Sequence, residues 1–339
     1  MQELSPAERA SSVERRLAQW ERLRHLVALA WERSAFYRRR WEAAGLPGPE
    51  ALTGLQDLPR LGSVTREELA WDQQAHPPWG SVLTVPPQRL LAVHRAGADG
   101  EMPFFWYDDA ESWQWVQGLW DYAFRAAGVR PGERALFACG FGPVSWYWAG
   151  LERAQQLGLM VISGAAMSPA QRLQNLVDLQ VTLLVGSPDE LLELARAAAE
   201  GASPVWKGCL RRILYACGPG TDPAETGHRL AAAWRAEALA VWWMAEAGLV
   251  AFECQCGTGR LHLLESELYA EVIDPETQEP LPPGGEGELV VTAFGRTAMP
   301  LIRLRTGERV ALDDTPCCCG RSFRLLRGGI REPRGRGGP

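Results

Sequence analysis

The stretch His94-Arg-Ala-Gly-Ala-Asp-Gly-Glu-Met-Pro103 decides how the rest of the chain is interpreted. It follows a short apolar run, residues 90–93, that predicts a strand, and it precedes an amphipathic helix expected over residues 108–127. A glycine-bearing turn between a strand and a helix is where an α/β fold usually holds a phosphate. Gly97 and Gly100 allow such a turn, but the side chains around them include two carboxylates and no lysine.

Composition places the chain among soluble globular proteins. Its 339 residues are 46% apolar and 22% charged, and they are enough for more than one structural unit. No apolar run is long enough to span a bilayer, and the N-terminus has no secretory signal pattern, so we expect a cytoplasmic protein with no membrane partner. The net charge of −6 argues against nucleic-acid binding.

Two residue types have unusual counts. Lys207 is the single lysine, so chemistry that needs a lysine elsewhere in this chain is excluded, and Lys207 itself lies in a turn typical of a solvated surface. The chain also has 15 tryptophans. They indicate either bulky core packing or an aromatic-walled pocket.

The hydrophobic pattern divides the chain into four parts. Residues 1–89 form a helical N-terminal segment, residues 90–246 an α/β core, residues 247–326 a small β subdomain, and residues 327–339 a disordered tail. In the core, short apolar strands alternate with helical patterns, which predicts a mainly parallel sheet covered by helices. The predicted strands of the core are 135–139, 159–163, 181–185, 212–215 and 238–243.

Several motifs resemble, in the same order, those of the phenylacetate–CoA ligases, a family of adenylate-forming (AMP-binding) enzymes. The most specific is Ala298-Met-Pro-Leu-Ile-Arg-Leu-Arg-Thr306, and the others are Trp31-Glu-Arg-Ser-Ala-Phe-Tyr37, Phe124-Arg-Ala-Ala-Gly-Val-Arg-Pro-Gly-Glu133, Gly140-Phe-Gly142 and Cys317-Cys-Cys-Gly-Arg321. The resemblance implies the fold of an adenylate-forming N-terminal domain. It also implies ATP with Mg²⁺ and CoA as cofactors: the family converts an aryl carboxylic acid to an acyl-adenylate and transfers the acyl group to CoA.

The phosphate loop departs from the family's pattern, which is approximately Ser-Ser-Gly-Thr-Thr-Gly-Lys-Pro. Its hydroxyl donors have become Ala98 and Asp99, and its lysine has become Glu101. One like-charge contact at about 4 Å costs roughly 1 kcal/mol in water and about 4 kcal/mol at an effective dielectric of 20. Lost hydrogen bonds to charged groups cost roughly 1.5–3 kcal/mol each. Together these changes predict a large loss of ATP affinity.

The second nucleotide motif reads Trp242-Trp-Met-Ala-Glu246 where the family has Tyr-Gly-Leu-Ser-Glu. By resemblance, Trp242 stacks on adenine and Glu246 helps to hold Mg²⁺, although Glu246 could also be an exposed carboxylate at a strand end. Trp243 replaces a glycine, so its indole fills pocket volume.

The third nucleotide motif, Arg303-Leu-Arg-Thr-Gly-Glu308, places Arg305 in the site and Glu308 at the family's ribose-binding aspartate. Glutamate can still accept two hydroxyl hydrogen bonds. The acidic residue of the family's Gly-Ala-Glu-Pro element is missing from residues 217–220. The sequence stops where the family's mobile C-terminal domain begins, so the adenylation lysine of that domain is not expected in cis.

Five cysteines and a histidine gather in the predicted β subdomain. In a cytoplasmic chain, cysteines are more often thiols or metal ligands than disulfides. By resemblance to family members with zinc at this place, we predict a structural tetrahedral site, with Cys256 as the substitute for Cys254; the alternative is a set of free thiols. The predicted zinc ligands are Cys254, His262, Cys317 and Cys319.

Three functions therefore remain open. The first is a degenerate ligase-like protein that keeps the scaffold without efficient adenylation, acting as a binding or regulatory subunit beside a homologous ligase or as a homodimer. The second is an active acyl-adenylating subunit completed by another chain. The third is a non-catalytic protein that binds a small aromatic carboxylate or an acyl-CoA. The lost donors of the phosphate loop, Trp243 and the missing lysine favour the first and third, whereas the retained Glu246, Arg305 and Glu308 favour the second. We expect the first.

Overall fold

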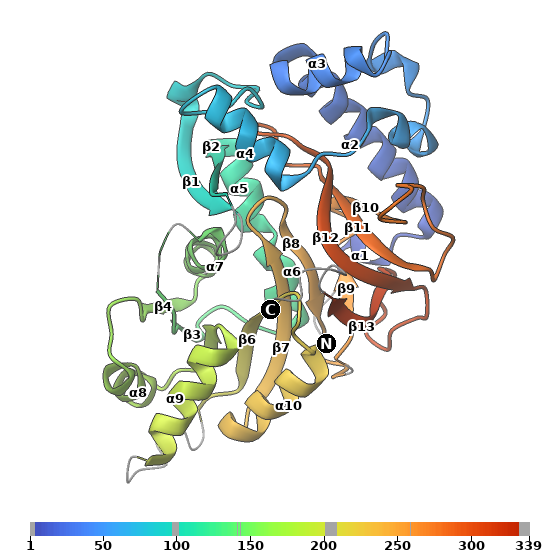
Figure 1. Ribbon diagram of the computed structural model, residues 1–339. Helices are drawn as coiled ribbons and strands as arrows, with labels where there is room; N and C mark the ends of the chain where they lie inside the picture. Colours follow the sequence, from blue (N-terminus) through green and yellow to red (C-terminus); the bar gives the residue numbers. More distant parts are fainter. Residues whose placement is uncertain are drawn as a thin grey trace, which may run out of the picture.

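The computed structural model describes residues 4–96, 102–140, 142, 144–200, 209–257 and 259–331. Among these residues, eleven strands form one sheet and two further strands form a hairpin beside it. Figure 1 shows the parallel part of the large sheet, with its helices, at one end of the molecule and the antiparallel part at the other.

Alternating strands and helices build the parallel part of the sheet, which confirms the α/β prediction. The strands are β3 (Arg134–Phe137), β4 (Met160–Ser163), β5 (Leu183–Gly186), β6 (Arg212–Cys217) and β7 (Glu237–Met244). The helices are α7 (Ser145–Gln156), α8 (Pro169–Asp178), α9 (Pro188–Glu200) and α10 (Pro223–Trp234). The strands lie in the order β4-β3-β5-β6-β7 and all run parallel. Their carboxyl ends meet at one edge, where sheets of this kind bind ligands.

The sheet continues past residue 246 with antiparallel strands. These are β8 (Gly248–Glu253), β9 (Leu261–Leu263), β10 (Leu268–Ile273), β11 (Glu286–Ala293), β12 (Leu301–Asp313) and β13 (Leu325–Arg331). Their spatial order from β7 is β8-β9-β13-β12-β11-β10. Because β8 is hydrogen-bonded to β7, these strands extend the same sheet, and the division of the chain at residue 246 stays a prediction.

Residues 104–109 form a strand, and the helix predicted from residue 108 begins only at Ala110. The aromatic run of β2 (Phe104–Asp109) pairs with β1 (Leu90–Ala96) as an antiparallel hairpin, since aromatic side chains suit a pleated surface. Asp109 then caps the helix by accepting a hydrogen bond from the Ser112 backbone N–H. The predicted helix is two helices, α5 (Ala110–Gly118) and α6 (Trp120–Ala126).

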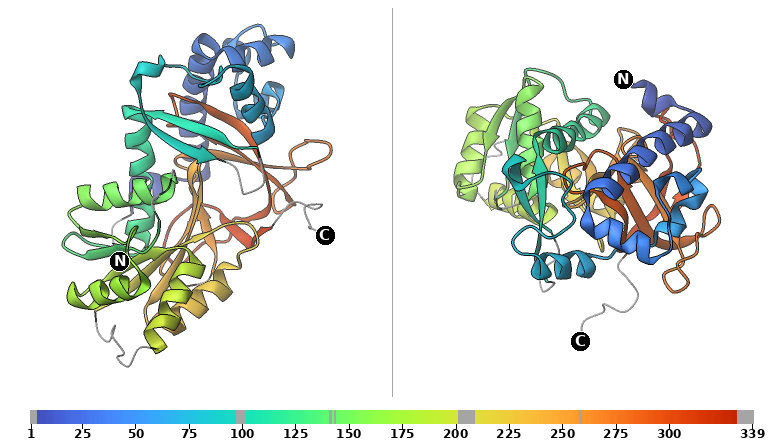
Figure 2. Two further views of the ribbon diagram at one scale, coloured as in Figure 1. Left: turned by 60° about the vertical axis from the view of Figure 1, so that its left-hand side comes forward. Right: turned by 90° about the horizontal axis from the view of Figure 1, so that it is seen from above.

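The N-terminal segment is helical, as predicted, and packs against the antiparallel strands (Figures 1 and 2). Its elements are α1 (Pro6–Arg9), α2 (Ser12–Arg33), α3 (Ala35–Ala43), α4 (Arg66–Ala75) and the short 3-10 turns η1 (Pro49–Ala51), η2 (Leu55–Leu61) and η3 (Pro87–Arg89). The buried Tyr37 hydroxyl on α3 donates to the Pro300 carbonyl at 3.0 Å and accepts from the Ile302 N–H at 3.1 Å. The helices are therefore fastened to β12 by buried hydrogen bonds as well as by apolar packing.

The disordered tail predicted for residues 327–339 is corrected by β13, which continues to Arg331. Its backbone pairs with β12, and Arg331 contacts Glu286 at 3.1 Å. Residues 332–339 lie outside the described residues. No helix in the described part of the chain is both long and apolar enough to cross a membrane.

Candidate functional site

Glu246 lies in the turn between β7 and β8, at the carboxyl ends of the parallel strands. The turn depends on Gly248, whose φ of 76° is rare for residues with a side chain. Glu246 is 2% exposed, so it is not the exposed strand-end carboxylate that the sequence left open. Its Oε1 accepts a hydrogen bond from Arg66 Nε at 2.6 Å.

Glu308 lies on β12, just after a bend at Gly307, where φ is 80°. Only 7% of Glu308 is exposed, and Oε1 lies 3.5 Å from an Arg66 terminal nitrogen. Burial raises the pKa of the Glu308 carboxyl, and the Arg66 charge partly offsets this effect. Within the described residues, Glu308 Oε2 is buried without a hydrogen-bond partner, so it is a free acceptor inside the protein.

Arg66 joins these two carboxylates from a distant part of the chain. It is the first residue of α4, whose N-cap Thr65 accepts a hydrogen bond from the Glu68 N–H. Residue 64 pairs with β12: the Val64 N–H donates to the Arg303 carbonyl at 2.9 Å, and the Arg305 N–H donates to the Val64 carbonyl at 2.8 Å. This pairing places the Arg66 guanidinium over β12, where it also donates to the Thr306 carbonyl at 2.5 Å.

A second, fully buried ion pair supports the turn that carries Glu246. Arg296 donates to both Asp108 oxygens, at 3.0 and 2.8 Å, and to the Ala245 carbonyl at 2.7 Å. Both side chains of the pair are 0% exposed. Burial raises the pKa of Asp108 to about 6, although the Arg296 charge acts in the opposite direction. The Arg296 guanidinium therefore fixes the backbone directly before Glu246.

His94 lies on β1 behind this ion pair. Its ring stacks on Trp113 at 4.7 Å, and the residue is 4% exposed. Neither ring nitrogen has a hydrogen-bond partner among the residues that the structure describes. Burial, and then the charge of Arg296, lowers the pKa of His94 to about 4, so the ring is neutral at pH 7.

The two tryptophans at the end of β7 have different environments. Trp242 is 1% exposed, which leaves its ring no free face for an adenine in this conformation, and its stacking role stays a prediction. Trp243 is half-buried and follows a shift in the register between β7 and β8. Its indole N–H donates to Ser145 Oγ at 2.9 Å, and its ring lies 6.0 Å from that of Trp120. The Trp243 side chain thus fills space beside the N-terminus of α7.

A model of the AMP-binding enzyme family matches residues 126–299. The chain belongs to this family. It is 30% identical to the phenylacetate-coenzyme A ligase of Thermus thermophilus over 316 residues, which cover 91% of this chain and 68% of that ligase. It is 28% identical to the corresponding ligase of Aromatoleum evansii, covering 91% of this chain and 69% of the relative. These matches confirm the family resemblance inferred from the motifs.

Comparison with solved structures shows that the fold agrees with this family assignment. A 2-hydroxyisobutyryl-CoA ligase, solved with 2-HIB-AMP and CoA, superposes with a TM-score of 0.89 at 27% identity, covering 98% of this chain and 72% of that one. The chain therefore has the α/β fold of an adenylate-forming CoA ligase.

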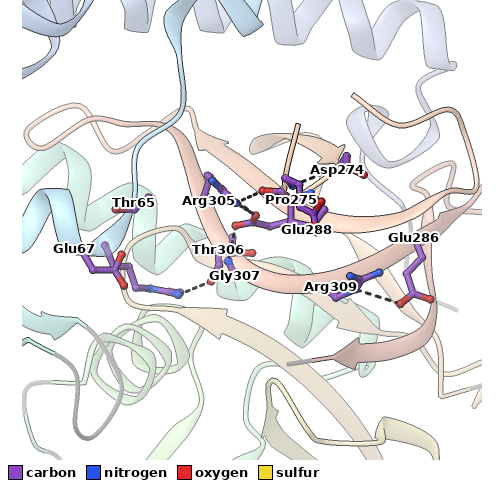
Figure 3. A pocket seen from close by; sticks show the side chains of 12 residues that line it. Thr65, Glu67, Asp274, Pro275, Glu286, Glu288, Arg305, Thr306, Gly307 and Arg309 are labelled. Atoms are coloured by element: carbon purple, nitrogen blue, oxygen red, sulfur yellow. Dashed lines mark hydrogen bonds and ion pairs between the residues drawn. The ribbon is translucent and has the colours of Figure 1, made fainter. Parts of the chain in front are cut away.

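Arg305, predicted as a site residue, has no hydrogen bond or ion pair with Glu246 or Glu308 among the described contacts. Its Nε donates to Glu288 Oε2 at 3.0 Å, and a terminal nitrogen donates to the Pro275 carbonyl at 3.0 Å. The side chain lines an open cavity of about 640 Å³ between α4 and β12 (Figure 3). The lining is highly charged and consists of Thr65, Arg66, Glu67, Asp274, Pro275, Glu276, Glu286, Glu288, Arg305, Thr306, Gly307 and Arg309.

The predicted zinc ligands come together. Cys254 Sγ lies 3.6 Å from Cys317 Sγ, and Cys319 Sγ lies 3.3 Å from His262 Nε2. The sulfur atoms of Cys254, Cys317 and Cys319 all lie within 4.8 Å of one another, and together with His262 they are a donor set that suits a tetrahedral thiophilic metal. Hydrogen bonds from Cys254 and then His262 lower the pKa of the Cys319 thiol.

One cysteine pairing was not predicted. Cys256 and Cys318 form a disulfide, whereas the sequence favoured thiols or metal ligands throughout. The disulfide engages the substitute ligand Cys256 and leaves the four predicted ligands free for a metal. It arises because the turn after β8 lies against the 317–319 turn, a contact that joins residues 62 apart in sequence.

Several site residues lie outside what the structure describes, and others were missed by the sequence. Gly97, Gly100, Asp99, Glu101 and Lys207 are outside the described residues. Arg66, Asp108 and Arg296 were not predicted for the site: Arg66 contacts Glu246, Arg296 contacts the turn at Ala245, and Asp108 pairs with Arg296. For Arg66, the capping sequence of residues 65–68 marks a helix start but carries no sign of what the arginine meets.

Proposed function

We propose that this AMP-binding family chain is a phenylacetate–CoA ligase-like protein that retains the scaffold and two carboxylates of the nucleotide site but carries out little or no adenylation by itself. The reaction of its relatives would require ATP, Mg²⁺, a carboxylic acid and CoA. The proposal concerns how much of that chemistry this chain retains.

The packing of Trp243 carries the proposal. Where the family has glycine, the indole is held by a hydrogen bond to Ser145 Oγ at 2.9 Å and by contact with the Trp120 ring. A side chain anchored at both its polar and its apolar parts does not swing away without losing both interactions. A carboxylic acid that approaches the β7 backbone here would meet the indole.

The charge of the phosphate loop supports the same conclusion. Asp99 and Glu101 replace a hydroxyl donor and a lysine in the sequence of the loop. A loss of about 4 kcal/mol in ATP binding corresponds to roughly a thousandfold in the dissociation constant. Even one uncompensated charge contact would thus move a micromolar dissociation constant for ATP into the millimolar range.

A structural zinc is part of the proposal. Cys254, His262, Cys317 and Cys319 would hold it between β8, β9 and the 317–319 turn. Four protein ligands leave no open position for water, so this ion would stabilise the fold and take no part in the reaction.

A second candidate function is favoured by Glu308. Its buried Oε2 without a partner, in the described part of the chain, suits a hydroxyl donor such as a ribose. Glu246 lies close by, since both carboxylates contact Arg66. The chain would then be an acyl-adenylating subunit completed by a lysine-bearing domain of another chain. A third candidate, a non-catalytic binder of an aromatic carboxylate or acyl-CoA, draws on the tryptophans near α7.

ATP–pyrophosphate exchange with a panel of aryl and short aliphatic acids, including 2-hydroxyisobutyrate, separates these candidates. We expect no exchange above that of a Glu246→Gln variant and no ATP binding by calorimetry below millimolar concentrations. Exchange that Glu246→Gln abolishes would overturn the proposal in favour of an active subunit. Binding of an acid or acyl-CoA in the absence of ATP would support the third candidate.

A further inference from the structure

Arg66, Glu246 and Glu308 form a closed charge cluster at the carboxyl end of β7. The guanidinium reaches Glu246 at 2.6 Å and Glu308 at 3.5 Å, while the Arg66 side chain remains 21% exposed toward the charged cavity. The two glutamates are 2% and 7% exposed. The cluster thus sets one cation between two buried carboxylates.

Two buried carboxylates this close require a counter-charge. Burial raises the pKa of the Glu308 carboxyl, the charge of Arg66 lowers it, and the charge of Glu246 adds a smaller rise. A cation between the carboxylates removes this repulsion. Arg66 supplies the cation from within the chain.

Family resemblance gives the place beside Glu246 to Mg²⁺, and the residues present do not fit that ion. Mg²⁺ needs near-octahedral oxygen ligands at about 2.0–2.1 Å and repels a neighbouring positive charge. Here Glu246 Oε1 is already engaged by Arg66 Nε. An ion bound directly to this oxygen would require the guanidinium to leave.

Contacts with β12 also hold the Arg66 guanidinium in place. Its terminal nitrogen donates to the Thr306 carbonyl at 2.5 Å, and the preceding residues pair with β12 through Val64. The N-cap Thr65 fixes the first turn of α4. Moving the Arg66 guanidinium away from Glu246 therefore requires breaking the hydrogen bonds of its side chain or moving the start of α4.

We infer that Arg66 is a built-in counter-ion between Glu246 and Glu308 that occupies the divalent-cation position beside Glu246. The chain accordingly excludes Mg²⁺ from Glu246, and a divalent ion binds there only when the arginine charge is removed. This inference goes beyond the proposed function, because it concerns metal binding and holds whether or not the chain adenylates an acid.

The test is Mn²⁺ binding, followed by electron paramagnetic resonance and calorimetry without nucleotide. We expect wild type and Glu246→Gln to bind Mn²⁺ equally weakly, and Arg66→Gln to bind it at least tenfold more tightly. The added Glu246→Gln substitution should abolish that gain, and Arg66→Lys should behave as wild type. Arg153→Gln is the matched control, because the Arg153 side chain is similarly exposed, at 26%, and pairs with Asp121 at 2.7 Å, outside the cluster of Arg66, Glu246 and Glu308.

Wild-type Mn²⁺ binding that Glu246→Gln weakens would overturn the inference, and so would equal affinities of Arg66→Gln and wild type. Because Arg66→Gln leaves two buried carboxylates unpaired, its melting temperature is measured with and without Mn²⁺. Rescue of stability by Mn²⁺ in this variant alone supports the inference, since an ion that binds only the folded state raises its stability. If Arg66→Gln does not fold, the comparison of wild type with Glu246→Gln decides.

Discussion

At the scale of single residues, the polar groups around the β7–β8 turn are unusually well buried. Asp108 and Arg296 are fully enclosed, His94 lies behind them, and Glu246 and Glu308 share Arg66. Buried charges are stable only when they are paired, so each of these residues constrains its neighbours. Their identities were visible in the sequence, but their partners were not, because every partner comes from another element.

His94 makes the folded state sensitive to acid. Its pKa is lowered to about 4 by burial and the Arg296 charge, whereas an unfolded histidine titrates near 6.5. Between these values the unfolded chain binds the proton and the folded chain does not, so the free energy of unfolding falls as pH drops from 6.5 to 4. We expect a loss of about 3 kcal/mol by pH 4.

His94→Phe, which preserves the contact with Trp113, should flatten that part of the profile in urea unfolding at several pH values. The exposed His25 provides the control, His25→Phe, which should retain the wild-type slope. Equal slopes for wild type and His94→Phe would contradict the prediction.

At the scale of elements, the local hydrophobic pattern predicted the strands and helices correctly where the two alternate regularly. The elements from β3 to β7 lie within a few residues of their predicted positions. The pattern failed at β2, where an aromatic strand runs directly into a helix that was predicted to begin at residue 108. In β12, the register with β11 shifts near Glu288, and the strand bends at Gly307.

The β7–β8 turn should tolerate little change at Gly248. Its φ is 76°, and an added Cβ would lie 2.4 Å from Leu119 Cδ1. We expect Gly248→Ala to lower the free energy of unfolding by about 1–2 kcal/mol, mainly through left-handed backbone strain, since the leucine tip can move. Gly218→Ala, where the added Cβ meets no atom within 4 Å, is the control and should change stability by less than about 0.5 kcal/mol. Similar losses in urea unfolding of both variants would count against the strain argument.

The predicted site of Cys254, His262, Cys317 and Cys319 should hold one metal ion per chain. Protein purified without chelator is expected to contain one equivalent of zinc by elemental analysis, and Cys319→Ser less than half of that. Cys209→Ser, which lies outside the cluster, should keep its zinc. Removal of the ion by a chelator should lower the melting temperature, because the ion joins β8 to the 317–319 turn. Less than half an equivalent in the wild-type protein would refute the metal site.

At the scale of the whole molecule, the N-terminal helices pack against the C-terminal part of the described chain. Glu8 on α1 is 0% exposed and pairs with Arg321 at 2.8 Å and with Arg125 on α6 at 3.3 Å. The same N-terminal segment brings α4 to β12 and so delivers Arg66 to Glu246, 180 residues away in sequence. The site is therefore assembled by the packing of the N-terminal segment against the sheet.

The Glu8 contact should contribute measurably to global stability. Glu8→Ala leaves two arginines without their buried partner, and breaking such a pair costs roughly 3–5 kcal/mol. We expect a single cooperative unfolding transition at a lower urea concentration, with the free energy of unfolding reduced by this amount. Glu14→Ala, which removes an exposed capping-box carboxylate on α2, should cost much less. A Glu8 variant no less stable than the Glu14 variant would show that the N-terminal contact is dispensable.

The sequence by itself determined the fold class, the order of the motifs and the group of cysteines with His262. These features depend on local alternation and short spacings, which are readable along a chain. Only the tertiary structure decided that Arg66 neutralises Glu246 and Glu308, that Arg305 pairs with Glu288 instead, and that Cys256 joins Cys318. Each of these is a contact between side chains from different segments, and it exists only because the packing of the chain brings those segments together.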